Sequence, residues 1–417
     1  MTTLILHRGN LPDLAQLLTA FDDAANAIVI ASADKISTPC QALIPSIHAQ
    51  VQALHLISQY DQSNALEQIV YEISQTQRIT QVFAMAEFDL YRAERLKSWL
   101  NLPFIPEKTL RIFRNKIAMK DYFRAAGLAT PHYAEVKSIL DVYDFAEKYG
   151  YPLVIKQQEG AGGVGARVLR SEKDIAQFAL ATFRPNGFTE PSLMVETFAQ
   201  GKLHHVDGVV YNQTILYLTC SVYINAAIED FEQGKSAGSV LLPNNSPIYQ
   251  ILSAHQHRLI ASSPISVPYT FHAEYFVTED QQVQLCEVAC RTGGAAINTA
   301  NALLRGVDLN AWLINSLFHH QALPIEPKNT DLSGGLIVSA QGLNKQRANQ
   351  IPERCPLPFV LDYQPKVSAG EVLSPAISNI QGLFSAVFSA ETPAQGTQHY
   401  QTLLDWQQEA LVLEALN

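Results

Sequence analysis

Two short segments of the chain carry the residue types best suited to chemistry. Residues 271–277 and 283–289 are rich in aromatic and β-branched side chains and are predicted to be strands joined by a polar turn. If Thr278 pairs with the first residue of the second strand, Glu274 lies directly opposite Glu287. Two like charges at that spacing destabilise a hairpin unless a cation lies between them. The pair therefore has two interpretations: a site that binds a divalent metal together with substrate phosphates, or a solvated hairpin in which the acidic pair is accidental.

The alternation of side chains along the second strand places two sets of residues on opposite faces. Glu287, Ala289 and Arg291 share one face, and Cys286, Val288 and Cys290 share the other. An arginine beside two carboxylates that hold a metal indicates phosphoryl chemistry, and we expect Arg291 to act in the chemical step. Both cysteines would face the core, so the sequence predicts no metal site at Cys286 and Cys290.

A glycine-rich segment at residues 160–165, Gly-Ala-Gly-Gly-Val-Gly, matches the G-x-G-x-x-G pattern of dinucleotide sites. That pattern requires a helix directly after the last glycine, because the pyrophosphate binds at the helix N-terminus. Residues 166–170 instead show a short β pattern, and helical periodicity begins at Ser171. The segment is therefore predicted to form the tip of a β-hairpin.

The tip of this hairpin has two interpretations. Its backbone N–H groups can form an anion site that closes over a nucleotide, or it is a glycine-rich surface turn. Lys156 ends the strand before the loop and could reach the same phosphates. A protein kinase carries its lysine after the glycine loop, and the Walker pattern G-x-x-x-x-G-K-[ST] does not occur in this sequence, so neither of those nucleotide sites is predicted.

Length and composition restrict the class of protein. With 417 residues, 47% hydrophobic and 16% charged, the chain is expected to form two or three well-packed domains. A net charge of −10 argues against a nucleic-acid partner, since phosphate backbones are bound by lysine and arginine. We find neither a signal-peptide pattern nor a run of about 20 apolar residues that would span a membrane. The five scattered cysteines are typical of free thiols in a reducing cytoplasm.

The order of strand and helix signals divides the chain into three parts. These signals alternate over residues 1–105, which predicts an α/β domain with a parallel sheet. Two prolines between residues 102 and 106 mark a boundary, and a second unit with the glycine loop covers 106–324. Residues 325–417 show strands and a terminal helix at 397–416, which predicts a smaller α+β domain.

Taken in order, these segments resemble the ATP-grasp superfamily of carboxylate–amine and carboxylate–thiol ligases. The similar region runs from about residue 114 to about residue 320, and the closest likeness is to bacterial L-amino-acid (dipeptide) ligases. The likeness depends on Glu87-Phe-Asp89, Asn115-Lys116 and Glu287-Val-Ala-Cys-Arg-Thr-Gly-Gly294, together with the glycine loop and the acidic pair. It implies a mixed α/β and α+β architecture, the ATP-grasp fold. Its parts would be a leading parallel α/β domain, a two-lobed ATP-binding region with a hinge near 194–199 and a C-terminal α+β domain.

The resemblance also implies a nucleotide site. The residues expected to bind ATP are Lys116, Lys156, Gly160, Gly162, Gly163, Val164, Glu196, Phe198 and His205. The two lysines match the pair that holds the phosphates, and the glycine loop would cover them. The glutamate and the phenylalanine lie in a segment similar to the hinge strand that contacts adenine. The histidine is a candidate for the ribose, with a packing or surface role as the alternative.

The same resemblance implies the metal and catalytic residues. Glu274 and Glu287 match the carboxylates that bind Mg²⁺ or Mn²⁺. Arg291 matches the arginine that steadies the γ-phosphate or an acyl phosphate. Lys235 lies in a segment similar to the mobile substrate loop, where it would supply a positive charge.

The sequence departs from the family pattern at two positions. Ala289 stands where an asparagine usually binds the metal, so the metal would have one fewer protein ligand. Leu203 stands where a glutamate usually binds the ribose.

The function that the resemblance implies is an ATP-dependent ligase. It would activate a small-molecule carboxylate as an acyl phosphate and join it to an amine, as in the coupling of two amino acids. ATP with Mg²⁺ or Mn²⁺ would be the cofactors, no nucleic acid or membrane is expected, and a homodimer is one candidate assembly. Two alternatives stay open: an enzyme that activates bicarbonate or formate, and a non-catalytic ATP-binding relative, which Ala289 and Leu203 motivate.

Overall fold

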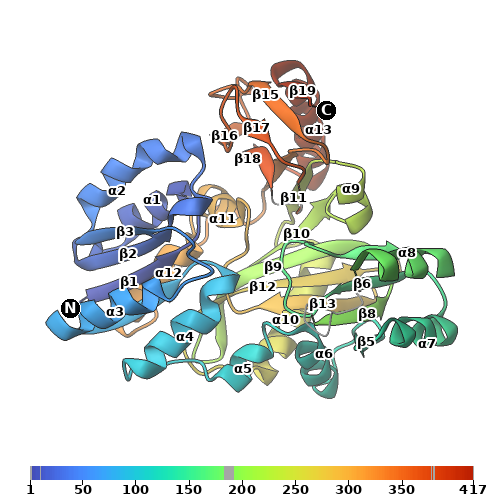
Figure 1. The fold of residues 1–417 in the computed structure, drawn as a ribbon, viewed down its shortest axis with the longest axis horizontal. Helices are drawn as coiled ribbons and strands as arrows, with labels where there is room; N and C mark the ends of the chain where they lie inside the picture. Colours follow the sequence, from blue (N-terminus) through green and yellow to red (C-terminus); the bar gives the residue numbers. More distant parts are fainter. Residues whose placement is uncertain (1, 10, 183–191, 377, 379–380, 417) are drawn as a thin grey trace.

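The computed structural model describes residues 2–9, 11–182, 192–376, 378 and 381–416. Figure 1 shows three parts: a layered N-terminal domain in blue, a lobe in cyan and green that carries the glycine loop, and a C-terminal part in orange and red. A separate large sheet of long strands runs from the middle of the chain into the C-terminal part. Within the described ranges, no helix combines the length and the apolar character needed to cross a membrane.

The N-terminal domain is built on a four-stranded parallel sheet, as predicted. Its strands, in spatial order, are β3 (Ala53–Ile57), β2 (Ala27–Ser32), β1 (Thr2–His7) and β4 (Ile79–Ala84). Every residue of β1 and β2 is buried, because helices cover both faces of the sheet.

Alternate residues of β1 and β2 belong to two different hydrophobic cores. The first core is covered by α1 (Leu11–Ala20), α2 (Ile44–Gln50) and α12 (Leu309–His319), and the second by α3 (Ala65–Thr76) and α4 (Leu90–Trp99). Helix α12 comes from the predicted second unit and packs on the N-terminal sheet, so these two parts share one core. Short 3₁₀ helices occur at Ala24–Asn26, Ala33–Lys35, Thr38–Leu43 and Glu87–Asp89.

A second, antiparallel sheet forms the lobe of the glycine loop. Its strands, in spatial order, are β5 (Tyr133–Val136), β8 (Leu193–Thr197), β6 (Leu153–Gln157) and β7 (Arg167–Leu169). The helices of this region are α5 (Glu107–Arg111), α6 (Lys116–Ala125), α7 (Ile139–Tyr149) and α8 (Glu172–Thr182). Strands β6 and β7 pair directly on either side of the glycine loop, so the predicted hairpin is confirmed.

The largest sheet has eight strands and runs through the middle and C-terminal parts of the chain. In spatial order they are β13 (Val283–Ala289), β12 (Tyr269–Val277), β9 (Lys202–Tyr211), β10 (Thr214–Ile224), β11 (Ala237–Leu241), β14 (Ser333–Ala340), β18 (Gly382–Ala390) and β16 (Val360–Pro365). Because β11 pairs with β14, this sheet continues across residue 325. The division of the chain at residues 105 and 324 stays a prediction.

Helices cover the large sheet at several places. They are α10 (Pro247–Ser262), α11 (Ile297–Arg305) and α13 (Pro393–Ala410), whereas α9 (Ile228–Glu232) contacts β7 of the glycine-loop sheet. Leu336 and Val338 of β14 pack with α11, whereas Ile337 packs with α13, so these two helices lie on opposite faces.

The end of the chain differs from the prediction. The terminal helix begins with Pro393 and ends at Ala410, and residues Val412–Ala415 form β19 instead of continuing the helix to 416. Strand β19 pairs with β15 (Gln346–Gln350), which also pairs with β17 (Val372–Leu373). The sequence of β19 is short and apolar, and its pairing partner lies more than 60 residues earlier, so local periodicity could not reveal the strand.

Candidate active site

Glu274 and Glu287 face each other in the β12–β13 ladder, as predicted, but the register that brings them together differs from the prediction. At the tip of the hairpin it is Val277, not Thr278, that pairs with Val283. The register then shifts by one residue between Tyr275 and Glu274. This β-bulge inserts an extra residue on β13 and restores the opposition of the two carboxylates.

The bulge also changes the faces of β13. Leu285 and Val288 both belong to the core beneath the sheet, together with Cys290, although strict alternation would place Leu285 on the other face. Cys286 is buried but is not part of that core; burial raises the pKa of its thiol to about 12, and Lys156 exerts the strongest opposing electrostatic influence. The prediction that Cys286 shares the core face with Cys290 was therefore wrong, because the extra residue breaks the alternation.

Lys116 joins the acidic pair to the glycine loop. Its Nζ lies 2.9 Å from Glu287 Oε2 and donates a hydrogen bond of 2.8 Å to the carbonyl of Gly160. Helix α6 presents this lysine at its first residue, because the side chain of Asn115 caps the helix by accepting from the Ala118 N–H. Lys116 therefore connects Glu287 to the loop that is predicted to cover the phosphates.

A second group of charges surrounds Glu196 on β8. Its carboxylate lies 2.6 Å from Lys156 Nζ and 3.1 Å from Lys120 Nζ, and all three side chains are buried. Lys120 also donates to the Cys286 carbonyl at 3.1 Å. The sequence reasoning did not identify Lys120; its position four residues after Lys116, on the same helical face, was the available signal.

The nearby lysines lower the pKa values of Glu287 and Glu196. Burial alone would raise the pKa of Glu287, but Lys116 and Lys156 outweigh it and lower that pKa to about 2. Burial also opposes ionisation of Glu196, and Lys120 and Lys156 lower its pKa below the usual range. The pKa of Lys156 is raised, because the attraction of Glu196 outweighs the cost of burial. At neutral pH both glutamates are therefore anionic and Lys156 is cationic.

The glycine loop has a backbone that suits glycine. Gly162, Gly163 and Gly165 have φ of 62°, 71° and 72°, a region that side-chain-bearing residues rarely adopt. The Val164 N–H bonds to the Ala161 carbonyl at 3.3 Å within the loop. Ser378, from the C-terminal part, donates a hydrogen bond of 2.7 Å to the Gly162 carbonyl. The loop is thus held against the C-terminal part of the chain.

Arg291 is anchored by a residue of the N-terminal domain. Its Nε donates to Glu87 Oε2 at 3.0 Å, its Nη2 forms a second contact with the same oxygen, and Arg114 pairs with the other oxygen. Because Glu87 follows β4, this contact joins the N-terminal domain to the end of β13. The sequence singled out both Glu87 and Arg291 but did not predict that they pair.

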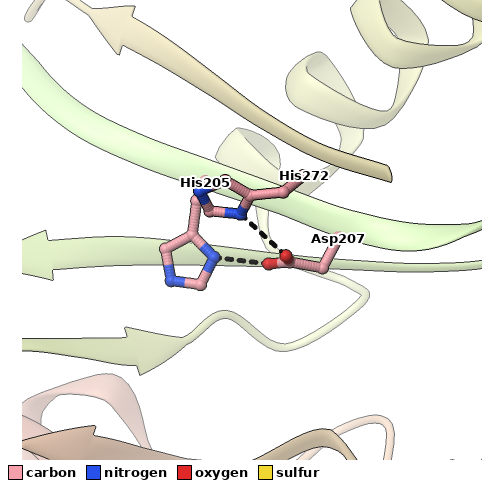
Figure 2. Close-up of side chains that lie close together, drawn as sticks. All are labelled: His205, Asp207 and His272. Atoms are coloured by element: carbon pink, nitrogen blue, oxygen red, sulfur yellow. Dashed lines mark hydrogen bonds and ion pairs between the residues drawn. The ribbon is translucent and has the colours of Figure 1, made fainter. Parts of the chain in front are cut away.

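His205 lies in a cluster with Asp207 and His272, which neighbouring strands β9 and β12 direct toward one another (Figure 2). His205 Nδ1 lies 2.5 Å from one carboxylate oxygen of Asp207, and His272 Nδ1 lies 2.8 Å from the other. Ligand atoms of the three side chains lie within 4.8 Å of one another, a spacing that a metal ion could occupy. The two imidazoles lower the pKa of Asp207 against the effect of burial, so it is ionised and accepts both hydrogen bonds. These two hydrogen bonds explain why the three side chains lie together, so a metal ion is not needed to hold them.

The histidine cluster contacts the acidic pair through His272. His272 Nε2 lies 3.4 Å from Glu274 Oε1, and Tyr223 donates to the same oxygen at 2.8 Å. Sequence reasoning missed His272 and Asp207, although each lies two residues from a predicted site residue on the same strand face. In the ladder, His272 also lies opposite Ala289, the position that lacks the expected asparagine.

Two further predicted residues lie away from these contacts. Lys235 pairs with Asp230 at 2.8 Å and its side chain is partly exposed, in the segment between α9 and β11. Phe198 follows β8 and donates its N–H to the Pro152 carbonyl at 3.2 Å, beside the strand that carries Glu196. Their roles in binding substrate or adenine stay predictions.

The donor set fits a divalent cation and a triphosphate. Two carboxylates face each other on adjacent strands, and carboxylate oxygens are the protein ligands that Mg²⁺ prefers. Lys116 and Lys156 supply positive charge between these carboxylates and the glycine loop. The role of each residue in binding ATP or the metal stays a prediction.

Comparison with known proteins agrees with this geometry. The ATP-binding domain of the carbamoyl-phosphate synthase L chain matches residues 115–214. That range carries Lys116, Lys156, the glycine loop and Glu196. An L-arginine-specific L-amino acid ligase of Bacillus subtilis is 21% identical over 304 residues, which are 72% of this chain and 71% of that protein. The chain therefore carries a match to an ATP-binding domain and is similar to ligases of the ATP-grasp superfamily.

Solved structures confirm the ATP-grasp fold over the whole chain. An L-amino acid ligase from Bacillus licheniformis superposes with a TM-score of 0.75 at 15% identity, covering 100% of this chain and 99% of that structure. The biotin carboxylase domain of the Hydrogenobacter thermophilus 2-oxoglutarate carboxylase, in complex with MgADP and bicarbonate, superposes with a TM-score of 0.69 at 13% identity, covering 100% and 91%. The ATP-grasp fold predicted from the motifs is therefore confirmed, and the chain is similar to ATP-dependent carboxylate–amine ligases.

Proposed function

We propose that this ATP-grasp protein activates the carboxylate of a small molecule, such as an amino acid, as an acyl phosphate and joins it to an amine. The observation that carries the proposal is the convergence of Glu274 and Glu287 with Lys116 and Lys156 beside a glycine hairpin. The similarity to proteins named L-amino acid ligases supports amino acids as the substrates.

The reaction follows from the chemistry of a carboxylate, which is a poor electrophile. A carboxylate oxygen of the first substrate attacks the γ-phosphorus of ATP, the bond to the β–γ bridging oxygen breaks, and ADP leaves. The nitrogen of the amine then attacks the acyl carbon, the bond to the phosphate oxygen breaks, and inorganic phosphate leaves as the amine loses a proton. The products are an amide, ADP and phosphate.

The residues of the chain position and stabilise these groups. Lys116 and Lys156 bind phosphate oxygens, and Arg291 offers a guanidinium toward the transferring group. Glu274 and Glu287 would hold Mg²⁺, which when bound neutralises charge that develops on the phosphates. Because an acyl phosphate is hydrolysed by water, the glycine loop and its contact with Ser378 exclude solvent during the reaction.

The test is a screen of standard amino acids in pairs with ATP and Mg²⁺, in which released phosphate and amide product are both measured. The proposal expects phosphate release that needs both a carboxylate and an amine, with one amide formed per phosphate. The Glu287→Gln variant serves as the inactive control.

Other results would assign a different function. Phosphate release with bicarbonate or formate, in the absence of an amino-acid carboxylate, would favour the related activating enzymes. Binding of ATP without release under any of these conditions would identify a non-catalytic ATP-binding protein.

A further inference from the structure

Tyr223 of β10 reaches across the large sheet to one of the expected metal carboxylates. Strand β9 lies between β10 and β12, and its residue His205 pairs with Glu274 on one side and with Ser221 on the other. Tyr223 follows Ser221 by two residues, so the two share a face of the sheet. The Tyr223 hydroxyl donates a hydrogen bond of 2.8 Å to Glu274 Oε1. The chemistry proposed above gives this tyrosine no role.

The histidine cluster supports the ring of Tyr223. The centroids of the Tyr223 and His205 rings are 4.6 Å apart, with their planes inclined by 45°. Asp207 anchors His205 in turn, because its carboxylate accepts the hydrogen bond from His205 Nδ1 (Figure 2). His205 Nε2 is buried and has no hydrogen-bond partner among the residues that the structure describes. The imidazole therefore acts as a packing surface that fixes the tyrosine ring.

The contacts of Glu274 distinguish its two carboxylate oxygens. Tyr223 donates to Oε1, and His272 Nε2 lies 3.4 Å from the same oxygen. Within the described part of the chain, both polar contacts of this carboxylate thus go to Oε1, which leaves Oε2 available for a cation. Groups that hold a metal ligand from behind orient it, and their loss typically lowers metal affinity by about tenfold to a hundredfold.

The missing asparagine makes this support more important. Ala289 leaves the expected metal ion with one fewer protein ligand. Of the two remaining carboxylates, Glu287 is held by Lys116 at 2.9 Å, whereas Glu274 is held by Tyr223 and His272. With fewer ligands around the ion, the direction in which each carboxylate oxygen points contributes more to its binding.

We propose that Tyr223 and His272 are positioning residues for the metal ion. They hold Oε1 of Glu274, so that Oε2 binds the divalent cation that accompanies ATP. Asp207 supports both of them, His272 directly and Tyr223 through the ring of His205. This inference rests on the proposed function, since that function requires the cation.

The test measures how Mn²⁺ strengthens nucleotide binding, without any turnover. Calorimetry gives the Kd of a non-hydrolysable ATP analogue at a series of free Mn²⁺ concentrations for the wild type, Tyr223→Phe and Glu274→Gln. In Tyr223→Phe, the Mn²⁺ concentration that produces half of the tightening should rise by about tenfold or more. The Kd measured in EDTA, without any divalent cation, should not change.

Tyr217→Phe is the matched control. Tyr217 lies on the same strand, and its hydroxyl donates to Asn301 Oδ1 at 2.8 Å, the same length as the bond from Tyr223 to Glu274. Both phenylalanine variants remove one hydroxyl hydrogen bond and should lower the temperature of thermal unfolding. Only Tyr223→Phe should shift the Mn²⁺ dependence, which a merely structural role would leave unchanged.

The outcomes separate this inference from the proposed function. If Glu274→Gln shifts the Mn²⁺ dependence and Tyr223→Phe does not, or if Tyr217→Phe shifts it equally, the positioning role is overturned and the proposed function stands. If nucleotide binding by the wild type does not respond to Mn²⁺, or Glu274→Gln responds as the wild type does, the metal site fails and the proposed function fails with it. Should Tyr223→Phe not fold, His272→Gln decides: a shifted dependence supports the positioning role, and an unchanged one overturns it.

Discussion

Glu274 and Glu287 lie opposite each other because a β-bulge at Cys286 offsets a one-residue difference in the register of their hairpin. Without the bulge, the pairing of Val277 with Val283 would set Glu274 opposite Cys286. Bulges are common beside active sites, where they redirect a side chain. Here the bulge brings the second carboxylate of an expected metal pair into place.

The first prediction concerns this pair. Glu274→Gln and Glu287→Gln should each lower ATP turnover by about a hundredfold or more, because each removes a charged oxygen ligand of Mg²⁺. Steady-state phosphate release over a range of Mg²⁺ and Mn²⁺ concentrations measures the effect, and nucleotide binding should be less affected. Glu279→Gln, at the exposed tip of the same hairpin, is the control. Normal turnover in either site variant would show that the pair does not bind a catalytic metal ion.

The second prediction concerns the glycine loop. Gly163 has φ of 71° and open space where a Cβ would lie, so conformation and not crowding limits its replacement. Gly163→Val should raise the KM for ATP by about tenfold, because a β-branched residue disfavours positive φ. Gly163→Asn, which tolerates that region, should stay within about threefold of the wild type. Equal effects of valine and asparagine would contradict the explanation.

Limited proteolysis gives a second view of the same loop. A non-hydrolysable ATP analogue should slow cleavage near Gly160–Gly165, since nucleotide would order the hairpin. A cleavage rate that does not respond to the analogue would argue against a loop that closes over ATP.

The third prediction concerns Arg291, whose planar group contacts Glu87 through two nitrogens. Arg291→Lys should lower kcat by about a hundredfold, equivalent to about 3 kcal/mol, while the affinity for ATP changes little. Glu87→Gln keeps the guanidinium of Arg291 but weakens the contact that positions it. A loss of kcat smaller than that of Arg291→Lys would distinguish the effect of positioning from the effect of the guanidinium itself. Near-normal kcat in Arg291→Lys, or a defect confined to folding stability, would show that this arginine does not act in the chemical step.

The fourth prediction concerns the buried pair of Asp207 and His272. Burial disfavours the charged His272, but Asp207 and Glu274 outweigh it and raise the pKa of His272 to about 10. A raised histidine pKa adds stability that is complete below the unfolded value of about 6.5 and is lost as pH rises toward 10. The lowered pKa of Asp207 adds stability that is present above its unfolded value of about 3.9 and is lost in acid.

The stabilisation from this pair should therefore be greatest between about pH 4 and pH 6.5 and should decline toward pH 10. Asp207→Asn should destabilise the fold by about 3 kcal/mol in that window, because it leaves a buried imidazolium without its partner. Thermal unfolding at several pH values, without nucleotide or divalent cations, measures the difference from the wild type. A difference that does not vary between pH 5.5 and pH 9.5 would refute the charged pair.

The sequence by itself determined the local features of the site. The glycine hairpin follows from a β pattern on both sides of the loop. The resemblance to ATP-grasp ligases was also evident from short motifs, because each motif depends on neighbouring residues. The parallel N-terminal sheet followed from the alternation of strand and helix signals.

The tertiary structure decided which of these residues meet. The bulge at Cys286, the anchoring of Arg291 on Glu87 and the joining of Lys120 to Glu196 depend on contacts between segments that lie far apart in the sequence. Strand register and side-chain packing select such contacts, and no local periodicity encodes them. For the same reason the contact of Tyr223 with Glu274, which reaches across β9, became visible only in the folded protein.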